Sequence, residues 1–263
     1  MGQRPDEGVR STSDWMASIR YRETLRPDAF LSDPCAGVLC GHSTEPAELL
    51  TGLGGPSEVV ISRGWLGDQL IGDAVAGGLD QVVLLAAGSD ARAWRLGLPA
   101  SVTLFEVDLP GQHPHKTQLL ATAGFEPTCR LIRVPADLRD PEWMMALRAA
   151  GFDVARPAVW LVEGLFYYTS TDFARDLIAN LVFPGSCLAF DIPHEAFRDE
   201  PSNQEFLAFM AQRGSPFTGF SSDPASLAPA WATRCYLAED LPIPDRLIRA
   251  QHPIWHVTGT IAL

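Results

Sequence analysis

The chain has 263 residues, of which 46% are hydrophobic and 20% are charged, a balance that is typical of a globular protein and excludes a disordered chain. The formal net charge is −12, and no stretch forms the basic stripe that binding to nucleic acid or to an anionic membrane surface requires. We therefore exclude nucleic acid and membranes as partners, expect a small-molecule substrate, and assign the whole length to one domain.

The cysteine pattern and the N-terminus indicate a cytoplasmic protein. The cysteine count of five is odd and no pair has CxxC spacing, which favours reduced thiols over a disulfide framework or a metal site. The first 14 residues are polar and lack the apolar segment of a secretory signal. The longest aliphatic run, residues 82–87, is too short to span a membrane.

The N-terminal part of the chain is predicted to be helical. Residues 1–14 are interpreted as frayed, and residues 15–31 as a helix that ends before Asp33 and Pro34. A stretch rich in glycine and proline, residues 51–56, precedes a second predicted helix over residues 58–77.

Short aliphatic runs then alternate with segments of helical character. This order predicts right-handed βαβ crossovers and a parallel sheet, and runs that are apolar on both faces fit strands covered by helices on both sides. The predicted strands are residues 81–86, 102–107, 130–134, 158–162 and 187–192, and the helices between them are residues 112–124, 141–151 and 171–181.

The C-terminal third adds a helical stretch and a final strand. Residues 195–213 are polar with helical character, a segment rich in proline and alanine follows, and residues 254–261 alternate as a strand does. With no internal repeat or long linker, we expect one domain over residues 1–263. Its predicted parts are a helical N-terminal lid (1–78), a cofactor-binding core (79–193), a lid insertion (194–230) and C-terminal strands (231–263).

The residues that follow the first two strands are candidates for ligand binding, because an open parallel sheet binds ligands at the carboxyl ends of its strands. Gly88 lets the backbone turn sharply and approach a ligand, or it belongs to an ordinary strand-to-helix turn. Glu106 and Asp108 share one face of the second strand. Asp108, nearer the tip, is predicted to accept hydrogen bonds from a ribose diol; the alternative is a solvated acid.

The third and fourth strands also end in carboxylates. Asp137 and Leu138 are predicted to bracket an adenine, with Asp140 as a helix N-cap in the alternative reading. Glu163, followed by glycine, is predicted to point into the cleft. The first turn reads AxGxDxR and not GxGxxG, so an adenosine without a pyrophosphate fits better than a dinucleotide. Carboxylates also suit a cationic sulfonium and ammonium.

These motifs resemble the leucine carboxyl methyltransferase-like branch of the class I S-adenosylmethionine-dependent methyltransferases, which includes tetracenomycin-type polyketide O-methyltransferases and related actinobacterial proteins. The matching stretches are residues 81–96, 105–110 with Lys116, 136–139 and 160–168. Weaker matches are residues 20–23 with Asp33 and Pro34, Arg63 with Asp68, and residues 215–219.

The resemblance implies a fold, a cofactor and a set of roles. The fold would be Rossmann-like, with a mostly parallel seven-stranded sheet, helices on both faces, a helical N-terminal segment and a lid insertion after the fifth strand. The cofactor would be S-adenosylmethionine. Its carboxylate would be held by Arg63 near Gly88, its ribose by Asp108, its adenine by Asp137 and Leu138, and its amino-acid end would face Glu163. This chain departs from the family at three positions. It has Ala86 where the family usually has glycine, and Ser89 and Ala91 where the family has leucine and threonine.

The family analogy predicts O-methylation of a carboxylate on a small, polyketide-like molecule. A carboxylate is already ionised near neutral pH and needs no base, whereas a hydroxyl acceptor does. Beside Glu163, the candidate catalytic residues are therefore His113 and His194, with His115 a further histidine near a strand tip; each also fits a surface or structural role. Predicted substrate contacts are Tyr167, Tyr168 and Phe217, with Phe166 and Phe220 as further aromatic candidates.

Two other functions stay open. One is an enzyme of this fold that has lost methyl transfer and catalyses another step such as a cyclisation, which the alanine at position 86 keeps in view. The other is a non-catalytic cofactor-binding protein. The oligomeric state is open as well, a homodimer included.

Overall fold

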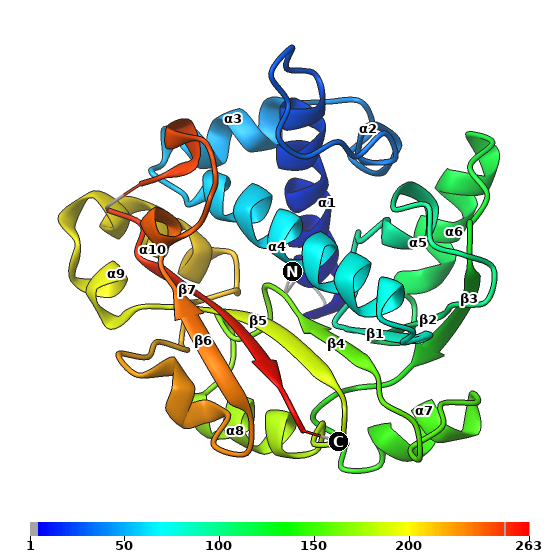
Figure 1. Cartoon of the computed structure of the whole chain (residues 1–263). Coiled ribbons are helices and arrows are strands. Elements are labelled where there is room, and N and C mark those ends of the chain that lie inside the picture. The colour runs from blue at the N-terminus through cyan, green and yellow to red at the C-terminus, as the bar shows by residue number, and fades with distance from the viewer. Residues whose placement is uncertain (1–4, 250, 263) are drawn as a thin grey trace.

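A seven-stranded sheet runs through the middle of the molecule (Figure 1). The computed structural model describes residues 5–249 and 251–262, and the side chains of all of these except residues 5–11 and His113. The strand order is β3-β2-β1-β4-β5-β7-β6; β1 to β5 are parallel, and β7 is antiparallel to both β5 and β6. The strands are β1 Gln81–Leu85, β2 Thr103–Asp108, β3 Arg130–Pro135, β4 Val159–Val162, β5 Cys187–Pro193, β6 Ala232–Tyr236 and β7 Ile254–Thr260.

This arrangement confirms the predicted fold class, a mostly parallel seven-stranded sheet of the class I methyltransferase type. The five aliphatic runs and the final alternating run each form a strand within one or two residues of the predicted bounds. β6 lies in the predicted C-terminal strand region but carries no aliphatic run of its own. It is an edge strand whose residues are half-buried or exposed, so its sequence lacks the signal of a buried strand.

The helices are α1 Pro5–Thr24, α2 Ala36–Leu39, α3 Glu45–Gly52, α4 Ser57–Ala76, α5 Arg92–Arg95, α6 Gln112–Thr122, α7 Trp143–Ala149, α8 Thr171–Ala179, α9 Glu195–Asp199 and α10 Gln204–Gln212. Two predicted helices were wrong in extent. α1 begins at Pro5, so most of the segment interpreted as frayed is helical, and it ends at Thr24 because Pro27 disfavours the helical conformation just before it. Pro201 divides the predicted helix 195–213 into α9 and α10.

Helices cover both faces of the sheet (Figure 1). Side chains of β1 alternate between the two cores: Val83 and Leu85 pack with α7 and α8, whereas Val82 and Leu84 pack with α4 and α6. A third apolar cluster joins α1, α3 and α4 to α9, α10 and the segment that precedes β7. The N-terminal helices and the insertion after β5 therefore meet each other beside the sheet. Among the described residues, no helix is long and apolar enough to cross a membrane.

Candidate functional site

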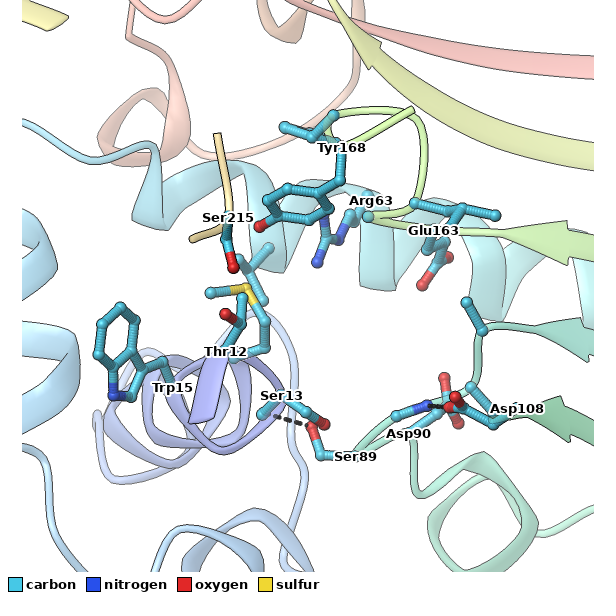
Figure 2. Close-up of a pocket in the computed structure, with 18 of the residues that line it drawn as sticks. Thr12, Ser13, Trp15, Arg63, Ser89, Asp90, Asp108, Glu163, Tyr168 and Ser215 are labelled. Atoms are coloured by element: carbon cyan, nitrogen blue, oxygen red, sulfur yellow. Dashed lines mark hydrogen bonds between the residues drawn. The ribbon is translucent and has the colours of Figure 1, made fainter. Parts of the chain in front are cut away.

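A cavity of about 1050 Å³ opens at the carboxyl ends of the parallel strands (Figure 2). Its walls come from α1, α4, the loops after β1 to β4, and the segment 206–217. Pockets for one drug-sized molecule usually measure about 300–1,000 Å³, so this cavity is slightly larger than that range. The position is the one predicted from the residues at the strand tips.

Gly88 and Asp108 lie together on this cavity, as predicted. The Gly88 N–H donates to Asp108 Oδ2 at 2.5 Å, and the Leu109 N–H donates to Oδ1 at 2.7 Å. Asp108 is 6% exposed and borders the cavity. Two backbone N–H groups thus fix its orientation, and because a carboxylate offers about four lone-pair sites, it retains capacity to accept further hydrogen bonds. Glu106, by contrast, is fully buried and pairs with Lys116 at 2.7 Å.

The loop between β1 and α5 is in close contact with α1. Gly88 has φ +47°, and a Cβ there would lie 2.8 Å from Ser13 Oγ, so a larger residue would strain the backbone and displace the Ser13 side chain. The Ser89 hydroxyl donates to the Ser13 carbonyl at 2.7 Å (Figure 2). Ala86, at the start of the loop, has φ +55°, a left-handed conformation that strains an alanine. The alanine at this position therefore carries a backbone cost that glycine would not.

Arg63 reaches the cavity from α4, and Figure 2 shows its guanidinium pointing into it. Nη1 donates to Asp191 Oδ2 at 3.0 Å, and the side chain is 12% exposed. Burial lowers the pKa of Arg63, but Asp191, Tyr167 and Glu163 together outweigh this effect and raise it, so the group is cationic. Asp68, further along the same helix, does not pair with Arg63 but with Arg92 at 2.7 Å and Arg95 at 2.6 Å.

Glu163 borders the cavity but is held by Arg92 in a two-bond pair. Arg92 Nη2 donates to Oε1 at 2.9 Å and Nη1 donates to Oε2 at 3.0 Å. Arg92 is 1% exposed and also pairs with Asp68 and Asp90. Burial raises the pKa of Glu163, and the Arg92 guanidinium opposes that shift. Sequence reasoning gave Arg92 no role, although it is the last residue of the AxGxDxR motif.

Asp137 and Leu138 both border the cavity, on its rim. The Asp137 side chain is 35% exposed, and Arg139 donates to it from Nη2 at 2.6 Å and from its backbone N–H at 2.9 Å. The side-chain hydrogen bond from Arg139 lowers the pKa of Asp137. The N-cap role considered for Asp140 is wrong, because α7 begins at Trp143 with Glu142 at its N-cap position; Asp140 instead accepts from the Glu142 N–H at 2.9 Å in the turn before the helix. An adenine contact by Asp137 stays a prediction, and it would be shared with Arg139.

Aromatic and aliphatic side chains line the part of the cavity farther from the strand tips. We call this part the aromatic chamber, and define it by Trp15, Met16, Tyr168, Phe206, Met210 and Phe217. The ring of Phe217 meets those of Tyr167, Tyr168 and Phe206 edge to face at centroid distances of 5.0–5.4 Å. The three predicted substrate residues are thus brought together on the cavity. Phe166 is instead buried in the core, and Phe220 does not border the cavity.

The candidate histidines have other surroundings where they are described. His194 Nδ1 accepts from the Ala196 N–H at 2.9 Å and so caps α9, its ring lies 5.4 Å from Trp255, and it does not border the cavity. His115 is exposed beside a small hollow at α6. The His113 side chain lies outside the described residues. None of the described histidines is therefore placed to act as a base in the cavity.

Sequence reasoning missed two contributions to the site. Thr12, Ser13 and Trp15 border the cavity from α1, where the sequence gave no sign of an ordered helix before Trp15. Asp191, near the end of β5, was read only as part of a strand. It accepts from Arg63, from the Tyr167 hydroxyl at 2.6 Å and from the Gly164 N–H at 2.7 Å. An acid inside an aliphatic run was the signal available.

Comparisons with known proteins agree with this geometry. Residues 15–182 match the model of the family described as leucine carboxyl methyltransferase. A protein of Mycobacteroides abscessus, named as an S-adenosyl-L-methionine-dependent methyltransferase, is 36% identical over 233 residues, which are 80% of this chain and 73% of that protein. A relative of the same name from Mycobacterium tuberculosis is 36% identical over 237 residues, 82% of this chain and 76% of the relative.

Solved structures share the fold at low sequence identity. A DUF574 family protein from Streptomyces avermitilis superposes with a TM-score of 0.65 at 16% identity, over 93% of this chain and 96% of that one. An O-methyltransferase family protein from Burkholderia thailandensis superposes with a TM-score of 0.51 at 17% identity, over 97% of this chain and 71% of that one. These likenesses support the fold alone.

Proposed function

Because the chain belongs to the leucine carboxyl methyltransferase family, whose cofactor is S-adenosylmethionine, we propose that it transfers the cofactor's methyl group to a carboxylate oxygen of a small apolar acid. The observation that carries the proposal is the cavity itself. It joins the polar strand tips, which suit the cofactor, to the aromatic chamber, which suits an apolar acceptor. A cofactor and an acceptor in one continuous cavity can be held in reacting geometry.

The residues at the strand tips fit S-adenosylmethionine, which supplies an electrophilic methyl group on a sulfonium. Asp108, oriented by two N–H groups, would accept from the ribose hydroxyls, and Arg63 would donate to the carboxylate. Around Arg92, three carboxylates face two guanidinium groups, which leaves one net negative charge. A negative charge near the cavity favours the cationic sulfonium and ammonium groups. The two carboxylates of this network that border the cavity are those of Asp90 and Glu163.

The chemistry of the chamber supports an acceptor that is already ionised. Burial raises the pKa of Tyr168 to about 12 and that of Tyr167 well above its usual value, so both phenols stay protonated near neutral pH. Arg63 also remains protonated. Tyr168 and Arg63 can donate hydrogen bonds to an anionic oxygen, whereas the single O–H of Tyr167 already donates to Asp191; none of the three removes a proton from a hydroxyl. The residues of this chain would therefore orient the acceptor and exclude water beneath α1 and the segment 206–217.

The experiment is an assay of the purified protein with S-adenosylmethionine and a panel of apolar carboxylic acids beside matched phenols. We expect a methyl ester, which alkali cleaves to methanol, and a rate that stays flat between about pH 6 and 8, well above a carboxyl pKa near 4. The Asp108→Ala variant is the control for cofactor dependence. A methylated phenol that resists alkali, with a rate that falls as a histidine protonates near pH 6.5, would contradict the carboxylate assignment.

A second candidate function is a reaction without methyl transfer, such as a cyclisation. Ala86 favours it, because its side chain borders the cavity at a left-handed position where a glycine would leave more room. The same assay separates the two functions. Consumption of an acceptor without formation of S-adenosylhomocysteine would support the second candidate.

A further inference from the structure

Asp191 holds together the two sides of the cavity. It is 1% exposed, on β5, and its Oδ2 accepts both from Arg63 Nη1 at 3.0 Å and from the Tyr167 hydroxyl at 2.6 Å. Its Oδ1 accepts from the Gly164 N–H at 2.7 Å, which fixes the loop after β4. One carboxylate thus connects α4, on the cofactor side, with Tyr167 beside the aromatic chamber.

The surroundings leave Arg63 little freedom to choose another position. Gly164 has φ +71°, and a Cβ there would lie 3.0 Å from the Arg63 guanidinium, so the loop closely follows the arginine. Ser62, the residue before Arg63 on α4, forms a hydrogen bond with His256 Nε2 at 3.1 Å. His256 lies directly opposite Asp191 in the β5–β7 register. Two successive residues of α4 are therefore anchored to two neighbouring strands.

We propose that Asp191 is a positioning residue for cofactor binding. A guanidinium carries five N–H donors, and the hydrogen bonds among the described residues use one of those of Arg63. With that donor committed to Asp191, the remaining ones are directed toward the cavity and the cofactor carboxylate. Asp191 also positions the Tyr167 ring, so that the place of the cofactor carboxylate at Arg63 and the aromatic residues beside the aromatic chamber keep a constant spacing. The inference rests on the cofactor of the family and not on the identity of the acceptor.

A hydrolytic Ser–His–Asp arrangement is the competing interpretation of these residues, and the geometry opposes it. Ser62 is fully buried and does not border the cavity, so no substrate reaches its hydroxyl. His256 Nδ1 is buried and has no hydrogen bond among the described residues, whereas a catalytic triad needs that nitrogen to donate to the acid. The three residues serve to hold Arg63.

The test compares two ligands that differ at the group Arg63 is proposed to hold. S-adenosylhomocysteine carries the amino-acid carboxylate, and 5′-methylthioadenosine lacks the whole amino-acid part. In calorimetry, Asp191→Asn should lower the affinity for S-adenosylhomocysteine at least tenfold and change the affinity for 5′-methylthioadenosine by less than about twofold. Arg63→Gln should do the same. Since both act through one contact, the double variant should bind no more weakly than Arg63→Gln alone.

The matched control is Glu23→Gln. Glu23 is 5% exposed, accepts from Arg246 at 2.8 Å and from the Phe30 N–H at 2.7 Å, and does not border the cavity. The Glu23→Gln variant should lower the thermal stability as the Asp191→Asn variant does, without changing the affinity for either ligand. Equal weakening of both ligands by Asp191→Asn, or losses that add to those of Arg63→Gln, would overturn the proposal.

A measurement on the unmodified protein keeps the proposal testable if the Asp191 variant does not fold. In a crystal structure with S-adenosylhomocysteine, Arg63 should donate to Asp191 and to the ligand carboxylate at once. A bound ligand with Arg63 turned away from Asp191 would refute it. Neither measurement requires a methyl acceptor, so the result stands apart from that of the proposed methyl transfer.

Discussion

Replacing Ala86 by glycine should stabilise the protein, although it removes a side-chain contact. Ala86 has φ +55°, and a non-glycine residue in the left-handed region costs about 1–2 kcal/mol. Glycine gives back part of this gain, about 0.4–1 kcal/mol, because it makes the unfolded chain more flexible. With the middle of each range, the net gain in the free energy of unfolding is about 0.8 kcal/mol. For a chain of this size, it raises the Tm by about 1–4 °C.

Thermal unfolding followed by circular dichroism measures this shift, with Ala87→Gly as the matched control. Ala87 is the next residue, is 9% exposed and has no positive φ, so glycine there should lower the Tm. If both variants lower the Tm, the left-handed strain at position 86 does not exist. Because Ala86 borders the cavity, the same variant also shows whether its methyl group limits cofactor binding.

Three further predictions concern binding, pH and the candidate base. Asp108→Ala should weaken S-adenosylmethionine at least tenfold in calorimetry, since each hydrogen bond to a charged group contributes about 1.5–3 kcal/mol; unchanged affinity would remove Asp108 from the ribose site. Burial lowers the pKa of His256 from 6.5 to about 4, so the folded protein binds a proton at this histidine less readily than the unfolded chain does. The free energy of unfolding should therefore fall by about 3 kcal/mol in all as the pH falls from 6.5 toward 4. Urea unfolding at several pH values should show this loss in the wild type and a smaller one in His256→Gln; equal losses would contradict it. His194→Ala should cost up to about 1 kcal/mol through the lost cap of α9 and leave turnover unchanged, whereas a hundredfold loss of turnover would make His194 the base.

The sheet could be predicted because its central strands carry a strong local signal. β1 and β4 are buried on both faces, so each is a continuous aliphatic run whose ends coincide with the ends of the strand. Parallel strands present their carboxyl ends at one edge, and this rule alone brings Gly88, Asp108 and Glu163 to one cavity. The weaker elements depend on tertiary contacts. β6 is an edge strand that pairs with β7, and the part of α1 before Trp15 contacts the Gly88 loop through Ser13.

The sequence could identify the acids at the strand tips, but the structure gives them different environments. Asp108 is held by backbone N–H groups, which leave its charge available to a ligand, whereas Asp137 is neutralised by Arg139, two residues further on. Glu163 is paired with Arg92, which lies 71 residues away in the chain and is shared with Asp68 and Asp90. The first pairing is local and could be suspected from an acid and an arginine close in sequence; the second arises only when β4 packs beside β1. A carboxylate at a strand tip is therefore a ligand-binding candidate to the extent that its charge stays uncompensated, and that depends on partners contributed by other elements of the fold. By this criterion, Asp108→Ala should lower the affinity of the protein for the cofactor more than Asp137→Ala does. Calorimetry on the two variants tests this order, and a larger loss for Asp137→Ala would contradict it.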